Sequence, residues 1–265
     1  MAEIFGYLSA LFVGVTLGLI GAGGSILAVP VLVYLLGVAP VRATGYSLFI
    51  VGITSLVGAL QYIRRDELNL RTGLRFAIPA CAAVLLDRWL IVPALPEQLF
   101  TLGDFRVTKD PAIMVFFAVI MLLSAFSMIR PGGKMPDGEA TQRQNSMKLP
   151  VLGFGVGLVT GLVGAGGGFL IIPALVLLAG LAMKEAVGTS LLIIAINSLV
   201  GFSGDLAGGG IDWRLLAHFT AFAVAGIVFG SYLTRFIPGR KLKPAFGYFV
   251  LIMGVYILLR EFGVF

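Results

Sequence analysis

Apolar residues fill eight long segments of this chain, separated by short polar stretches. A helix needs about 20 apolar residues to cross a bilayer, and most of these segments approach or exceed that length. The pattern predicts an all-α polytopic membrane protein. The segments cover residues 4–36, 43–61, 73–95 and 112–129 in the first half, and 150–180, 186–206, 214–236 and 244–262 in the second.

Composition and charge agree with this class. Only 12% of the 265 residues are charged and the mean hydropathy is +1.02, whereas soluble domains are about a quarter charged. The net charge of +6 comes from basic residues at segment ends, such as Arg64 and Lys241. They are placed to anchor spans and set orientation, so nucleic acid is not an expected partner. Cys81 is the single cysteine and His218 the single histidine, so we expect no disulfide, metal or other cofactor.

The two halves of the chain are related by a constant offset of 143 residues, as Gly21 and Gly164 illustrate. The register holds without a gap between residues 14–76 and 157–219. Shared leucines are expected by chance in so apolar a chain, but glycine, proline and serine at one fixed offset indicate an internal duplication. Matched pairs include Gly18/Gly161, Gly23/Gly166, Gly24/Gly167, Pro30/Pro173, Gly37/Gly180, Gly45/Gly188, Ser47/Ser190, Ser55/Ser198 and Gly58/Gly201.

A polar stretch rich in glycine, proline and charges of both signs separates the halves at 130–150, which is typical of a connection in water. We therefore predict a first transmembrane repeat at 1–130, a linker at 131–149 and a second repeat at 150–265. The first apolar segment has no basic region before it and no small-residue cleavage site, so we expect it to be a retained span.

The first segment of each half carries a glycine-rich stretch followed by a proline: GLIGAGGSILAVPVL from Gly18 and GLVGAGGGFLIIPAL from Gly161. Glycine weakens a helix interior and proline removes a backbone hydrogen bond. A helix of about 30 residues is also about 45 Å long, which exceeds a hydrocarbon core of about 30 Å. We predict a break in each segment, which makes the segment either a kinked span or a re-entrant hairpin.

Basic residues help to choose between these alternatives. If each break reverses the chain, the loops at 64–75, 130–148 and 235–243 fall on one side of the membrane and hold most of the Lys and Arg residues, as the positive-inside rule prefers. Kinked spans would divide the basic residues almost evenly. The count favours an odd number of passes in each half, and hence inverted repeats.

Breaks at matching positions also indicate a function. Non-helical backbone persists inside a membrane only where it is buried in protein or lines a wet cavity, and many secondary transporters build a midplane substrate site from such breaks. A helix should begin after each break, near Ser25 and Gly168, and its free N–H groups and dipole suit an anion. Close helix packing is the structural alternative for these small residues.

We predict that the substrate contacts both breaks and the polar residues of the segments that follow. Hydroxyls open ATGYSL (43–48) and AVGTSL (186–191), where they either cap the helix or donate to a ligand. Polar residues at the middle of the same segments should face the bundle interior. The candidate substrate-binding residues are Gly21, Gly23, Gly24, Ser25, Ser47, Thr54, Gly164, Gly166, Gly167, Gly168, Thr189, Ser190 and Asn197.

Charged residues within the apolar segments are few, and Asp87, Arg88 and Asp205 are among those without a charged counterpart in the other half. For Asp87 and Arg88 we expect an ion pair at the membrane interface beside Trp89, and a role in transport is the alternative. For Asp205, two roles stay open: it relays a proton, or it simply faces water.

The duplicated motif resembles that of the TauE/SafE sulfite exporter family of membrane permeases. Each half has G-L-[IV]-G-A-G-G-[SG], a proline shortly after it, and then A-x-G-x-S-L. The resemblance covers essentially the whole chain, and Gly21–Ser25 and Gly164–Gly168 match the family motif directly. It implies a multi-pass transporter of the cell membrane, often one that exports sulfite or small organosulfonates. Two departures are the serine at position 25, where the second copy has a glycine, and a polar loop at 96–111 that is longer than a typical family connection.

These patterns together predict a secondary transporter, not an enzyme, that exports a small anion by alternating access at a site between two repeats, coupled to protons or to the membrane potential. The expected partners are the anionic substrate and the lipid bilayer, and a homodimer is compatible with the sequence. The alternative is a permease or channel for a different small solute or ion. A cation pathway would place an acidic residue in the duplicated site, and an enzyme would need a nucleophile–base set or metal ligands. The sequence offers neither.

Overall fold

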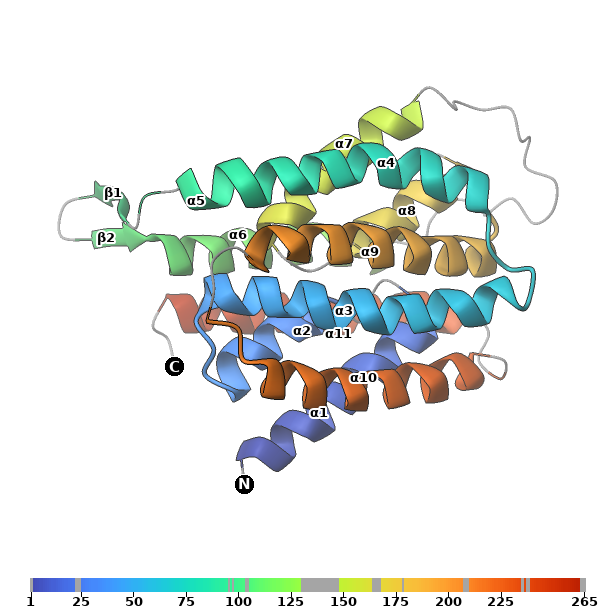
Figure 1. The fold of residues 1–265 in the computed structure, drawn as a ribbon, viewed down its shortest axis with the longest axis horizontal. Coiled ribbons are helices and arrows are strands. Elements are labelled where there is room, and N and C mark those ends of the chain that lie inside the picture. Colours follow the sequence, from blue (N-terminus) through green and yellow to red (C-terminus); the bar gives the residue numbers. More distant parts are fainter. Residues whose placement is uncertain are drawn as a thin grey trace.

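The computed structural model describes residues 2–21, 25–94, 96, 98–102, 105–129, 148–163, 168–177, 179–206, 210–234, 236 and 239–262. Long helices lie side by side in one bundle (Figure 1). The helices are α1 (Ala2–Ile20), α2 (Ser25–Pro30), α3 (Pro40–Ile63), α4 (Leu70–Leu86), α5 (Val92–Ala94), α6 (Lys109–Ile129), α7 (Lys148–Val163), α8 (Gly168–Leu177), α9 (Met183–Asp205), α10 (Trp213–Leu233) and α11 (Gly239–Glu261), with π-helical turns η2 (Val31–Leu35) and η3 (Asp87–Ile91).

Four helical stretches of the described residues are long and apolar enough to cross a membrane: Pro40–Ile63, Leu70–Ala94, Lys184–Asp205 and Trp213–Leu233. They match four of the apolar segments expected from the sequence to within a few residues, and the chain is confirmed as a helical, multi-pass membrane protein. The longest apolar segment of each half contains two helices instead of one. Helix α1 ends at Ile20 and α2 begins at Ser25, while α7 ends at Val163 and α8 begins at Gly168.

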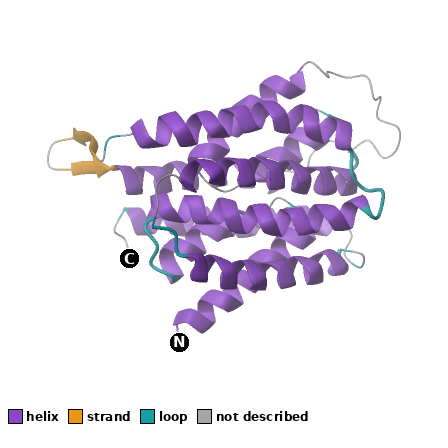
Figure 2. Ribbon diagram, viewed as in Figure 1, coloured by secondary structure: helices purple, strands orange, loops and turns teal. Residues whose placement is uncertain are grey.

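The expected polar loop at 96–111 contains a β-hairpin, so the fold is not purely α-helical. Strands β1 (Gln98–Leu102) and β2 (Phe105–Thr108) pair antiparallel, with Phe100 opposite Val107 and Leu102 opposite Phe105. Aromatic and β-branched residues favour strands, which explains why this stretch pairs instead of staying irregular. The hairpin projects from one end of the bundle (Figure 2), which we call the hairpin end.

Helices α3 and α9 form an antiparallel pair at the centre of the bundle (Figure 1). Near the start of α3, Gly45 lies against Asp205, the last residue of α9. Midway along, a Cβ placed on Gly52 would come within 2.9 Å of the Leu199 side chain. Successive contacts therefore run in opposite directions along the two helices. The start of α3, the end of α4 and the end of α9 all lie toward the hairpin end.

Each of the other close helix pairs joins the first half of the chain to the second. Helix α1 packs parallel to α10, α7 packs parallel to α4, and α6 packs on α11. A Cβ on Gly14 would overlap the carbonyl oxygen of Ala223, and one on Gly226 would overlap that of Leu11. Glycines four residues apart allow such backbone contact between membrane helices. Helices α2 and α8 lie inside these pairs. Helix α2 contacts α3, helix α8 contacts α9, and α2 and α8 contact each other.

This packing predicts opposite effects for two Gly→Ala substitutions. Gly14→Ala should destabilise the protein by about 1–3 kcal/mol, because the added methyl group overlaps the α10 backbone. Gly155→Ala, in α7, is the matched control: no atom lies within 4 Å of its added Cβ, and alanine favours helix by about 0.5–1 kcal/mol. Thermal unfolding in detergent measures both. An equal melting temperature for the two variants would contradict the close contact between α1 and α10.

Candidate functional site

The first break starts at Gly21, whose φ of +72° lies in the left-handed region that only glycine adopts readily. A Cβ at this position would come within 2.8 Å of Val187 Cγ1 and 3.3 Å of Ser190 Oγ. The backbone of the first half thus lies directly on the second turn of α9. Gly21 and Ser190 are both predicted substrate-binding residues, and the structure brings them together.

The helices that follow the breaks begin in the protein interior. Ser25 is completely buried at the start of α2, and Gly168 is buried at the start of α8. Helix α2 runs on into η2, so residues 25–35 form one continuous helical stretch. Side chains of both stretches, including Leu27 and Ile171, join the central apolar core. The N-terminal N–H groups of two helices are therefore held inside the bundle, where no lipid reaches them.

Five predicted binding residues lie outside the described residues, so the structure does not place them. The structure places the other eight. The five are Gly23, Gly24, Gly164, Gly166 and Gly167.

Ser47 and Ser190 occupy equivalent positions in the two halves and make the same local bond. Ser47 Oγ donates to the Thr44 carbonyl at 3.1 Å, and Ser190 Oγ donates to the Val187 carbonyl at 2.8 Å. Both side chains are completely buried. A serine that donates to its own helix keeps its oxygen as an acceptor, so these bonds alone do not identify a binding role.

Thr189 connects two helices. Its hydroxyl accepts a hydrogen bond of 2.9 Å from the backbone N–H of Asn69, the N-cap of α4. The equivalent bond exists in the other half, where the Tyr46 hydroxyl accepts from the N–H of Asp212, the N-cap of α10, at 2.8 Å. Tyr46 is the counterpart of Thr189, and Asp212 that of Asn69. The Thr189 hydroxyl therefore docks the start of α4 onto α9.

Buried polar groups without a partner among the described residues occur near the middle of both α3 and α9. The Asn197 Oδ1 accepts from Cys81 Sγ at 3.0 Å, but its Nδ2 has no hydrogen-bond partner among the described residues. The hydroxyls of Ser55 and Ser198, which are equivalent positions, also lack partners there. Thr54 donates to the Ile50 carbonyl. Buried polar groups are nearly always paired, so this set calls for an explanation such as a ligand or an unseen water.

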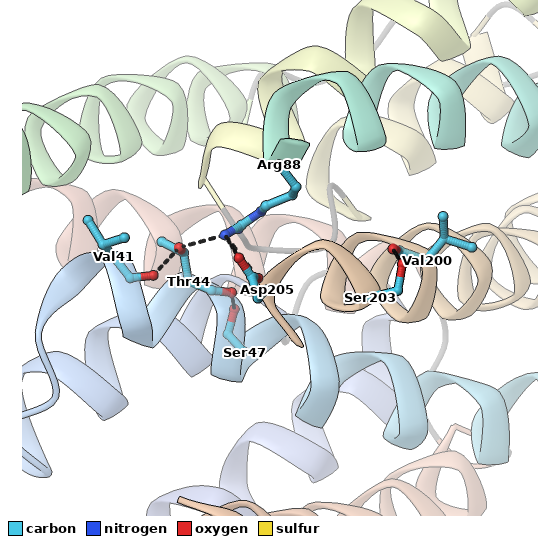
Figure 3. Close-up of polar contacts among 7 residues, drawn as sticks. All are labelled: Val41, Thr44, Ser47, Arg88, Val200, Ser203 and Asp205. Carbon is cyan, nitrogen blue, oxygen red and sulfur yellow. Dashed lines mark hydrogen bonds and ion pairs between the residues drawn. The ribbon is translucent and has the colours of Figure 1, made fainter. Parts of the chain in front are cut away.

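The expectation of an interfacial Asp87–Arg88 pair is wrong. The Asp87 and Arg88 side chains are both buried, and Arg88 bonds to Asp205 instead. Figure 3 shows the guanidinium reaching from the end of α4 to Asp205 on α9 and Thr44 on α3, with Nη1–oxygen distances of 3.2–3.3 Å. Trp89 is 63% exposed. Arg88 and Asp205 are 117 positions apart in the sequence, so no local pattern could indicate this contact.

Sequence reasoning also missed Ser55 and Ser198 as site residues, although it identified them as a matched pair. The available signal was that each adjoins a predicted residue, Thr54 or Asn197, at the middle of an apolar segment. Among the residues that the structure places, His218 belongs to no group of three potential metal ligands. Its ring is exposed and packs against Tyr7.

Removing either docking hydroxyl should reveal a structural role. Thr189→Val and Tyr46→Phe each leave a helix N-cap N–H without its acceptor, which costs about 1–3 kcal/mol when the group is buried. Ser203→Ala is the control, since that exposed serine bonds only to its own helix, at Val200. Thermal unfolding in detergent should rank both docking variants below this control. Unchanged melting temperatures would show that neither hydroxyl holds the helices together.

Comparison with known proteins identifies the family to which this chain belongs. The chain is 27% identical to a "Probable membrane transporter protein" of Xylella fastidiosa over 256 residues, covering 95% of this chain and 93% of the relative. It is 29% identical to the "Probable membrane transporter protein YunE" of Bacillus subtilis over 272 residues, covering 94% and 92%. No solved structure matches the chain significantly. The family described as "Sulfite exporter TauE/SafE" matches residues 7–257. This match spans nearly the whole chain, which therefore belongs to the TauE/SafE sulfite exporter family of membrane transporters.

Proposed function

We propose that this transporter exports a small anion, either sulfite or an organosulfonate, through a site between α3 and α9. The observation that carries the proposal is the set of unpaired buried donors at the centre of this helix pair: the Asn197 amide and the hydroxyls of Ser55 and Ser198. The family's description supports sulfite as the substrate, whereas the names of the relatives specify none.

The charge pattern around these donors supports an anion. Helices α2, α3 and α8 contain no acidic residue, and α9 has none between Glu185 and Asp205. An anion in this region would meet N–H and O–H donors without a facing carboxylate. Nitrogen and oxygen donors in a water-poor interior bind an anion more strongly than they do in water.

The proposed site extends from the first break to the helix centre. Ser190, beside Gly21, precedes Asn197 by seven residues, which is about 10 Å along a helix. The first break supplies backbone N–H groups at the start of α2, and by the duplication the second break supplies them at the start of α8. Ser47 and Thr54 on α3 are the counterparts of Ser190 and Asn197. The full candidate set is Gly21, Gly23, Gly24, Ser25, Ser47, Thr54, Gly164, Gly166, Gly167, Gly168, Thr189, Ser190 and Asn197.

We further infer that residues 1–130 and 150–265 are inverted repeats with re-entrant first segments. Two features support this. Helices α3 and α9 begin 143 residues apart, as do α4 and α10. The equivalent helices α3 and α9 run antiparallel, which two copies of one fold achieve only if one copy is inverted across the membrane. Inverted repeats can exchange conformations, which gives alternating access to a site between them.

Equivalent residues should then face opposite sides of the membrane. Leu70 and Trp213 begin α4 and α10, are 55% and 54% exposed, and are 143 positions apart. In a Cys81→Ala background, Leu70→Cys and Trp213→Cys should each react with an impermeant thiol reagent from one side of oriented vesicles, and from opposite sides. Labelling of both from the same side would contradict the inverted arrangement.

The substrate is tested by flux in proteoliposomes. The protein should transport sulfite or a short alkanesulfonate, and Asn197→Leu should reduce flux strongly, because a leucine of similar size removes the donors without opening a cavity. Gly23→Leu should do the same by filling the first break. Ser203→Ala is the control. Ser203 is an exposed residue of α9, the helix that also carries Asn197, and this variant should keep full flux. The proposed site would be excluded if the protein transported none of these anions. It would also be excluded if Asn197→Leu left the KM for the transported anion unchanged.

A further inference from the structure

Asp87, Arg88 and Asp205 form a largely buried charged cluster toward the hairpin end of the bundle, and none of the three is a residue of the proposed anion site. Arg88 is 3% exposed, and its Nη1 bonds both carboxylate oxygens of Asp205 and the hydroxyl of Thr44. Arg88 extends from the first half of the chain and Asp205 from the second (Figure 3). This ion pair therefore ties α9 to α3 and α4 across the interface between the halves.

One carboxylate of the cluster has no partner. Asp87 is completely buried, and neither of its oxygens has a hydrogen-bond partner among the described residues. Its side chain lies directly against Gly161, in the last turn of α7, near the second glycine-rich stretch. The Nε and Nη2 atoms of Arg88 are equally unpartnered. This edge of the guanidinium, which can bind a carboxylate in a bidentate manner, is thus unused. The residue before Arg88 in the chain is Asp87, the acid that has no partner among the described residues.

The charges of the cluster do not balance. Two carboxylates face one guanidinium, and an unpaired charge is very costly to bury in a water-poor interior. One bound proton makes the cluster neutral: it leaves one carboxylate for the ion pair with Arg88 and turns the other into a neutral acid. In this structure Asp205 is the paired carboxylate and Asp87 is the one left to carry the proton.

The described residues of α3 and α7 that contact the cluster are neutral. Helix α3 contributes Thr44 and Gly45, with Gly45 against Asp205, and α7 contributes Gly161. The charged group that acts on Asp87 is Arg88, and the same guanidinium acts on Asp205. The two carboxyls are therefore the titrating groups of the cluster.

The opposite end of the bundle has no such cluster at the equivalent positions. The counterparts of Asp87, Arg88 and Asp205 are Gly230, Ser231 and Tyr62. There the Ser231 hydroxyl bonds to the Gln61 side chain, and the Arg65 guanidinium donates to the Ser231 carbonyl. No carboxylate occupies these equivalent positions. Among the described residues, a cluster of two carboxylates and one guanidinium at these equivalent positions is therefore found at the hairpin end alone.

We propose that Asp205, Arg88 and Asp87 form a proton relay that couples transport to a proton gradient. The inference rests on the proposed transport function and names its coupling site. A proton from water at the hairpin end binds Asp205, whose side chain is 27% exposed, and breaks its ion pair with Arg88. The unused edge of Arg88 then pairs with Asp87, which releases its own proton toward the bundle interior. One proton enters, one leaves, and the ion pair that ties α9 to α3 and α4 at this end is broken in the same step.

Flux measurements separate coupling from transport. Reconstituted wild-type protein should exchange sulfite at equal pH and accumulate it under a pH gradient. Asp205→Asn removes the ion pair and the proton acceptor, so it should keep exchange and lose gradient-driven accumulation. Asp205→Glu should restore accumulation. Asp66→Asn is the matched control, since Asp66 is an exposed acid in a turn, at a positive φ that asparagine tolerates, and it should keep both activities. Gradient-driven accumulation by Asp205→Asn would overturn the relay.

A second measurement needs no substrate. Infrared difference spectra of the purified protein should show the carbonyl band of a protonated carboxylic acid at neutral pH. The band should be absent in Asp87→Asn and also in Asp205→Asn, where Arg88 pairs with Asp87 and keeps it ionised, and present in Asp66→Asn. A band that persists in both cluster variants would overturn the inference even if anions are transported. If no anion is transported but the band behaves as expected, the proposed substrate is wrong and the proton site stands.

Discussion

The antiparallel contact between α3 and α9 requires two helix backbones to approach at Gly45, Gly52 and Gly188, where side chains would collide with the partner helix. Other features of the interior depend on this approach. It places Thr189 within reach of the α4 N-cap and Tyr46 within reach of the α10 N-cap. It also encloses the starts of α2 and α8, so that backbone groups which could not be exposed to lipid are sheltered by protein.

Hydroxyl groups in this bundle show how polar side chains are accommodated without water. Most bond to a carbonyl three or four residues earlier in their own helix, as Thr16 and Thr160 do. Ser55, Ser198 and Thr220 have no partner among the described residues. A buried hydroxyl is therefore an ordinary feature of these helices. Unpaired groups that occur together, at equivalent positions of two central helices, are the exception that needs a ligand or water.

The sequence predicts well what local pattern determines and poorly what long-range contact determines. Apolar length located the spanning helices, and glycine with proline located the ends of α1 and α7, because both properties act within one segment. The offset of 143 residues anticipated the equivalent N-cap positions 69 and 212. The pairing of Arg88 with Asp205, however, depends on how three helices cross. Likewise, whether the Thr189 hydroxyl serves an N-cap or a ligand depends on a neighbour 120 residues away.

The parallel packing of α1 on α10 has a consequence for biogenesis. Helix α1 is synthesised first, but its glycine-lined face fits a helix that starts at Trp213. At about 5–20 residues per second, α1 waits on the order of tens of seconds for its partner to be made. During that time the glycine-lined face has only lipid, or a chaperone of the insertion machinery, to cover it. The contact between α1 and α10 can therefore form only late in synthesis, and the membrane has to keep the glycine-lined face of α1 from pairing wrongly until then.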